Sequence, residues 1–182
     1  MNDTLKTYIE QYTEFEHGLR ELISEKGQSL CGSCTRCCCD TIICEEAVES
    51  PFLKLVHQQT EHFSEKYGFL TESGCLLKQG RPPVCYEYFC DDHFFHQPDE
   101  LQAELLKILG ALLHHATRNA KGDLPLEEIM KEEDLDLLDF PQMEQQMQES
   151  IQALGIILTF YRDGTLPAAS YEVLKQIHLS EE

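Results

Sequence analysis

The stretch that organises this chain is Cys31–Cys44, with the sequence CGSCTRCCCDTIIC. It holds six of the nine cysteines, and the other three, Cys75, Cys85 and Cys90, form a second cluster. Two intervening residues allow one tight turn to present two sulfurs to the same metal ion. The repeated Cys-x2-Cys spacing that begins at Cys31 therefore predicts a thiolate metal site.

Disulfide bonding and simple burial account for the cysteines less well. An all-disulfide arrangement leaves one thiol over, and the contiguous residues Cys37 to Cys39 would need awkward neighbouring bridges. Burial as small hydrophobic side chains would account for a single cysteine better than for six within fourteen residues. Metal binding is the preferred interpretation.

The number of cysteines suggests how many ligands are used. Nine cysteines would fill two four-sulfur sites with one left over, and Cys39 is the one we leave out. Cys37 and Cys38 would face opposite sides of an extended backbone, so one of them could serve a second metal. The candidate metal ligands are Cys31, Cys34, Cys37, Cys38, Cys44, Cys75, Cys85 and Cys90.

The cysteine spacing is compatible with two kinds of metal centre. A short loop with repeated two-residue spacing can supply three corners of an iron–sulfur cluster, with the fourth ligand from elsewhere in the chain. Zinc suits all-thiolate structural sites equally well. We prefer an iron–sulfur cluster for the first cysteine group and keep zinc as the alternative.

Other polar residues near the cysteines are secondary candidates. Asp91, Asp92, His93 and His96 could form a harder nitrogen and oxygen site, although a polar approach to the next helix is the preferred interpretation. His57, His62, His114 and His115 are expected on helix surfaces. Arg36 and Arg81 lie inside the cysteine clusters, where a guanidinium can donate hydrogen bonds to thiolate sulfurs.

Three motifs between residues 30 and 90 carry a family resemblance: Cys31-x2-Cys34-x2-Cys37-Cys38, Gly74-Cys75, and Arg81-Pro82-Pro83-Val84-Cys85. They resemble the CxxCxxCC cysteine-cluster family of small bacterial proteins, described as zinc- or iron-chelating domains and also found in flagellin lysine N-methylases. The family often has another cysteine before the Arg-Pro step, where this chain has Leu-Leu-Lys-Gln-Gly. Cys44 or Cys90 would then replace that thiol.

The remainder of the chain predicts helices. Apolar residues at steps of three and four indicate a helix over Asp3–Lys26, capped by Asp3 or Thr4. Further helices are predicted from Pro51 to near Gly68, from Pro98 to Gly122, from Pro141 to Asp163, and from Pro167 through Ile177. The acidic connector after Gly122 is expected to hold short helical turns, and Ile42-Ile43 and Tyr86–Phe89 short extended pieces. The predicted buried side of the Pro141 helix comprises Met143, Met147, Ile151, Leu154, Leu158 and Tyr161.

The predicted fold class is therefore mainly α, with residues 1–182 forming a single helical domain. Two cysteine-rich loops within region 30–90 converge on a metal site, and region 98–178 forms a helical C-terminal portion. Helices between and after the cysteine clusters would set the distance between them.

Charge restricts the partners. The chain has 14 basic and 33 acidic side chains and a net charge of −19, which disfavours nucleic acid and anionic membrane surfaces. No apolar run reaches the ~20 residues that span a bilayer, and the N-terminal residues do not resemble a secretory signal. We expect a cytoplasmic protein, with a basic protein surface as the kind of partner that its acidity would suit.

These patterns favour a metal-binding protein with a structural or accessory role. The alternative is an iron–sulfur-dependent enzyme or enzyme component, acting in electron transfer or in protein modification; the methylation version rests on the family resemblance alone. A third hypothesis is metal storage or delivery, which the surplus of thiols favours.

Overall fold

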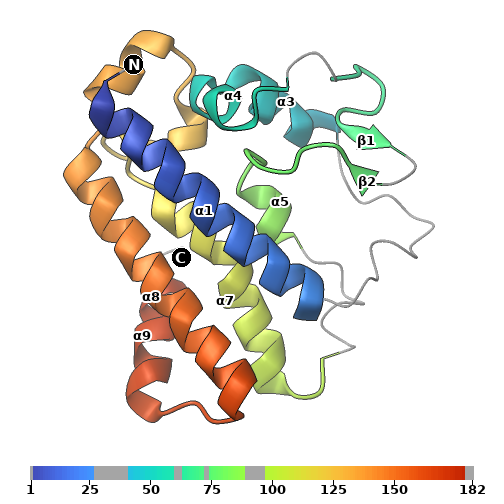
Figure 1. The fold of residues 1–182 in the computed structure, drawn as a ribbon, viewed down its shortest axis with the longest axis vertical. Helices are drawn as coiled ribbons and strands as arrows, with labels where there is room; N and C mark the ends of the chain where they lie inside the picture. Colours follow the sequence, from blue (N-terminus) through green and yellow to red (C-terminus); the bar gives the residue numbers. More distant parts are fainter. Residues whose placement is uncertain (1, 27–40, 60–62, 72–73, 89–96, 179–182) are drawn as a thin grey trace.

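The computed structural model describes residues 2–26, 41–59, 63–71, 74–88 and 97–178. These residues are mainly helical, which confirms the predicted fold class (Figure 1). Their buried apolar side chains form one hydrophobic cluster that includes residues from α1 to α9. Among the helices in these ranges, none has the length and apolar character that crossing a membrane requires.

Helix α1 (Asp3–Lys26) has the predicted bounds and packs against α7 and α8; in Figure 1 it runs beside α8 in a similar direction. Its buried apolar side follows the three- and four-residue steps of the sequence. The predicted cap is wrong by one residue, because the backbone N–H of Leu5 donates to Oδ1 of Asn2 at 2.7 Å. The buried apolar residues are Leu5, Tyr8, Tyr12, Phe15, Leu19 and Leu22.

The long helices α7 (Glu100–Thr117) and α8 (Phe140–Asp163) pack against each other, and α9 (Ala168–His178) packs on both. The carboxylate of Asp99 caps α7 by accepting from the N–H of Gln102 at 2.8 Å. This helix ends at Thr117, before the predicted Gly122. The short 3-10 helices η2 (Leu126–Glu128) and η3 (Glu132–Leu137) confirm the helical turns expected in the acidic connector.

The predicted buried side of α8 is partly wrong. Ile151 and Leu158 are 40% and 47% exposed. Instead, α8 turns Ser150 and Ala153 toward the protein interior, and the Ser150 hydroxyl donates to the carbonyl of Leu112 on α7 at 3.0 Å. Small side chains let the two helices approach closely, and a hydrogen bond makes the polar one tolerable in the core. An apolar pattern alone does not reveal this rotation.

A set of shorter elements lies along the side of α1 that is away from α8 and α9 (Figure 1). It comprises α3 (Thr41–Glu49), α4 (Pro51–His57), the paired strands β1 (Leu70–Thr71) and β2 (Gly74–Cys75), and α5 (Val84–Glu87). The strands are antiparallel, with Leu70 opposite Cys75 and Thr71 opposite Gly74. We call these elements, together with the loops between them in the described ranges, the cysteine corner.

Three predictions within this corner need correction. Ser50 caps α4 as predicted, but the helix ends at His57 because Gln58 adopts a left-handed conformation with φ of 53°. Ile42-Ile43 lies in a helix and not in an extended piece. Tyr86 and Glu87 also lie in a helix, so the second predicted extended piece is wrong for these two residues, whereas Tyr88 has an extended backbone.

Candidate metal centre

Cys44 lies on α3, and its side chain packs closely against Gly68, which lies just before β1. A Cβ atom added to Gly68 would lie only 2.5 Å from the Cys44 sulfur, and Gly68 has a φ of +58°. Its N–H donates to the carbonyl of Ser64 at 2.7 Å, closing a tight turn around it. Only glycine suits this position, because both the conformation and the contact with sulfur exclude a side chain.

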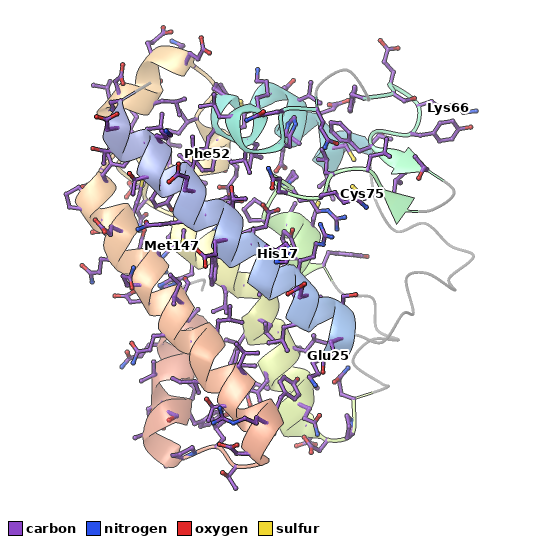
Figure 2. The ribbon with its side chains drawn as sticks, in the orientation of Figure 1. His17, Glu25, Phe52, Lys66, Cys75 and Met147 are labelled. Carbon is purple, nitrogen blue, oxygen red and sulfur yellow. The ribbon has the colours of Figure 1, made fainter. Side chains whose placement is uncertain are left out.

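The turn at Gly68 connects Cys44 to the second cysteine cluster. Two residues beyond Gly68, Leu70 pairs with Cys75 across the small sheet. Both sulfurs are half-buried and pack against the hydrophobic core. In Figure 2, Cys75 lies on the side of the sheet that faces the helices. Cys44 and Cys75, one from each sequence cluster, therefore lie in the same corner of the fold.

Cys85 occupies a different environment. It is exposed, at the start of α5, which packs on α7. No disulfide joins Cys44, Cys75 and Cys85 to one another. The other five predicted ligands, Cys31, Cys34, Cys37, Cys38 and Cys90, lie outside the described residues, as do Cys39, Arg36, His62 and the Asp91–His96 candidates.

A buried carboxylate holds the loop that leads to Cys85. Glu16 of α1 is fully buried and accepts from the N–H of Gly80 at 2.6 Å and of Arg81 at 3.0 Å. The hydroxyl of Tyr86 donates to the same carboxylate at 2.7 Å. Burial raises the pKa of Glu16, while these three hydrogen bonds and the charge of Arg81 act in the opposite direction.

Sequence reasoning did not identify Glu16. The available signal was an acidic residue between Tyr12 and Leu19 on the apolar side of α1, where a charge needs partners to be buried. The partner loop is fixed from a second direction by Gly80, whose added Cβ would meet the backbone N of His57 at 2.9 Å. Glu16 and α4 thus position the Arg-Pro-Pro segment between them.

Arg81 does not behave as a free cation near the cysteines in this arrangement. Its side-chain Nε donates to the carbonyl of Leu77 at 2.8 Å, four residues earlier in the same loop. Together with the Glu16 contact, this bond orders the loop backbone. The hydrogen bond expected from Arg81 to sulfur stays a prediction, and the observed contacts of this residue are to oxygen.

Two histidines predicted on the surface are buried. His57 is 3% exposed, with Nε2 at 2.9 Å from the carbonyl of Ala47 and Nδ1 accepting from the N–H of Gln59 at 2.9 Å. Both ring nitrogens are thus engaged within the protein, which leaves neither for a metal. His115 is 2% exposed and bonds Glu149 through Nε2 at 2.9 Å. Burial lowers the pKa of both histidines.

His114 of α7 lies close to carboxylates of the cysteine corner and of the acidic connector. Its Nδ1 lies 3.5 Å from a carboxylate oxygen of Glu87 on α5 and 3.4 Å from one of Glu127 in η2. Across the described ranges, however, no group of three or more His, Cys, Asp or Glu side chains is arranged to hold a metal ion. The described cysteines supply part of a site at most.

Comparisons with known proteins add no relative. No family model matches this chain, and neither a curated protein nor a solved structure matches it. The resemblance to the CxxCxxCC family stays a prediction from the motifs.

Proposed function

We propose that this chain is a metal-binding protein that holds an iron–sulfur cluster or zinc through cysteine thiolates, in a structural or accessory role. The proposed ligands are Cys31, Cys34, Cys37, Cys38, Cys44, Cys75, Cys85 and Cys90. The observation that carries the proposal is the contact between Cys44 and Gly68, which brings a first-cluster cysteine beside the strand pair that holds Cys75.

The packing at Gly68 fits a thiolate site. The absent Cβ leaves room for the sulfur of Cys44 where any other residue would displace it. Two sequence-distant cysteines lie half-buried at the core boundary, and solvent exclusion of this kind strengthens metal–thiolate interaction. Cys85 is exposed to solvent, where a metal ion could reach its sulfur.

Electrostatics supports a bound cation. Several thiolates close together in a chain of net charge −19 would repel one another and the surrounding carboxylates. A metal ion offsets this repulsion and keeps the thiolates deprotonated. A reducing compartment such as the cytoplasm, which we propose as the location, would keep the cysteines available for it.

The metal determines the role. An iron–sulfur cluster supplies a redox centre when bound, whereas zinc supplies a redox-inert crosslink. The contribution of this chain is the same in either case: Glu16 holds the loop that leads to Cys85, and the turn at Gly68 packs against Cys44 on α3.

The test is metal content and visible absorption of protein purified without oxygen. Brown absorbance with iron and sulfide would identify a cluster, and colourless protein with bound zinc a zinc site. Cys44→Ser and Cys75→Ser should each lower the metal-to-protein ratio, whereas Cys39→Ser, the matched control, should leave it unchanged. Circular dichroism would verify that each variant is folded.

Two results would contradict the proposal. One is purified, folded protein that contains no stoichiometric metal and takes up neither zinc nor iron with sulfide. The other is an unchanged metal-to-protein ratio in both the Cys44→Ser and the Cys75→Ser variant, because the cysteine corner would then not be the metal site.

A further inference from the structure

The outward side of α8 carries an exposed stripe with a regular spacing. Its members alternate steps of four and three residues, which keeps them on one side of a helix as in a coiled-coil seam. All are exposed, and a Cβ added to Gly155 would meet no atom within 4 Å. We call this set the α8 stripe: Glu144, Gln148, Ile151, Gly155, Leu158 and Arg162.

The α8 stripe is unusual in its charge. Between Glu144 and Arg162 it has no ionisable side chain, and the exposed neighbours Gln145, Gln152 and Thr159 are uncharged as well. The whole chain carries a net charge of −19. The uncharged middle of the α8 stripe would itself add no charge repulsion between two acidic copies.

The spacing of the α8 stripe is the same when it is read in reverse. In two antiparallel α8 helices related by a twofold axis at the level of Ala153, each position of the α8 stripe therefore lies opposite another position of the stripe in the second copy. Ile151 of one copy then faces Gly155 of the other, where the missing side chain makes room for it. Leu158 faces Gln148.

The same register brings opposite charges together at both ends. Glu144 of one copy lies opposite Arg162 of the other. Within its own chain, Arg162 donates to Asp163 from Nε at 2.7 Å and from Nη2 at 2.9 Å. A guanidinium has five N–H donors, so Arg162 can hold the second carboxylate without releasing Asp163.

We propose that the α8 stripe is an interface for a second copy of this chain, in an antiparallel twofold pair. The stripe spans about 27 Å along the helix, which is small for a stable complex. The dimer is therefore weak, with a dissociation constant of about 10 µM or higher. In Figure 1, α8 and the β1–β2 sheet lie on opposite sides of the molecule, so pairing leaves the cysteine corner accessible.

Charge reversal tests the proposed register by sedimentation velocity of the full chain from about 5 to 500 µM. Glu144→Arg and Arg162→Glu should each raise the dissociation constant by at least about tenfold, since each places like charges at both ends of the pair. The double variant should restore the original value to within about threefold, because the pairs are exchanged and not lost. Glu132→Arg, at an exposed position of η3, is the control for altered net charge.

A substitution at Gly155 tests packing at the dimer interface without disturbing the fold of the monomer. Gly155→Leu should weaken the dimer by at least about tenfold because it fills the space for Ile151, while the open surroundings leave the monomer folded. Its circular dichroism should match that of the original chain. A monomer throughout the concentration range, a dimer insensitive to all these changes, or failure of the double variant to restore pairing would each overturn the proposal.

Discussion

The long helices and the cysteine corner are stabilised in different ways. Helices α1, α7 and α8 have 24, 18 and 24 residues and share a continuous apolar core, with fully buried leucines such as Leu109 and Leu112. The corner is built from helices of four to nine residues and two-residue strands. Elements this short have little stability of their own.

The comparison shows where specific contacts matter most. In the helical core, many similar apolar contacts together stabilise the packing. In the corner, a few contacts determine the position of the backbone: the Glu16 carboxylate, the Gly68 turn and, by our proposal, the metal. The corner should therefore respond to small chemical changes that leave the helices intact.

Metal removal should separate the two regions most clearly. Structural zinc can contribute about 10–16 kcal/mol, so its loss should unfold the corner locally. We expect hydrogen exchange in residues 41–50 and 64–71 to accelerate at least about 100-fold with a strong chelator, while exchange at Leu105–Leu113 changes less than about threefold. Equal acceleration in both regions would show that the helical core also depends on metal.

Loss of the Glu16 carboxylate should be the next largest effect. Glu16→Ala leaves two backbone N–H groups and the Tyr86 hydroxyl without their acceptor, at a cost of about 3–5 kcal/mol. The melting temperature should fall by about 10 °C. Glu14→Ala, at an exposed position of the same helix, is the control. Similar melting temperatures for the two variants would refute the structural role of Glu16.

Alanine at two left-handed glycines should isolate the contact with sulfur. Gly68 and Gly164 have similar φ values of +58° and +70°, but an added Cβ meets Cys44 at the first and nothing within 4 Å at the second. Gly68→Ala should therefore destabilise the protein by about 1–3 kcal/mol more than Gly164→Ala, and should also lower metal content. Equal urea denaturation midpoints for the two variants would contradict the role of this contact.

The smallest expected effect is on pH dependence. Burial lowers the pKa of His57 below its ordinary value of 6.5, so the unfolded chain binds a proton more readily than the folded one. The contribution of His57 to folding stability is therefore fully present above pH 6.5 and is lost as the pH falls toward the lowered pKa. We measure the free energy of unfolding by urea denaturation at pH 7.5 and at pH 5.5. The difference between the two values should be smaller for His57→Gln than for the original chain.

Two details make the pH measurement specific. Burial raises the pKa of Glu16, so its contribution has the opposite sign and stability from this group falls as the pH rises. Because Glu16 is present in both the original chain and His57→Gln, its effect on stability cancels when the two are compared. His17→Gln, at an exposed position of α1, serves as the control, and an equal change in both histidine variants would exclude His57 as the source.

Local sequence signals predicted most of the helices. Periodic apolar residues located α1 with its bounds, and the pair Ser50-Pro51 located the start of α4. The same signals misjudged where α4 ends and which side of α8 is buried. Helix ends depend on the conformation of single residues such as Gln58, and the orientation of α8 depends on contacts across the fold such as the hydrogen bond from Ser150 to Leu112 of α7.

The sequence by itself determined that this chain is mainly helical, strongly acidic and rich in clustered cysteines, because periodicity, charge and spacing are local properties. Only the tertiary structure decided that Glu16 is buried beneath the Arg-Pro-Pro loop, that Gly68 receives the sulfur of Cys44, and that Ile151 faces outward. Each of these depends on which segments meet across the fold. Contacts between distant segments set burial and hydrogen bonding, and no local pattern encodes them.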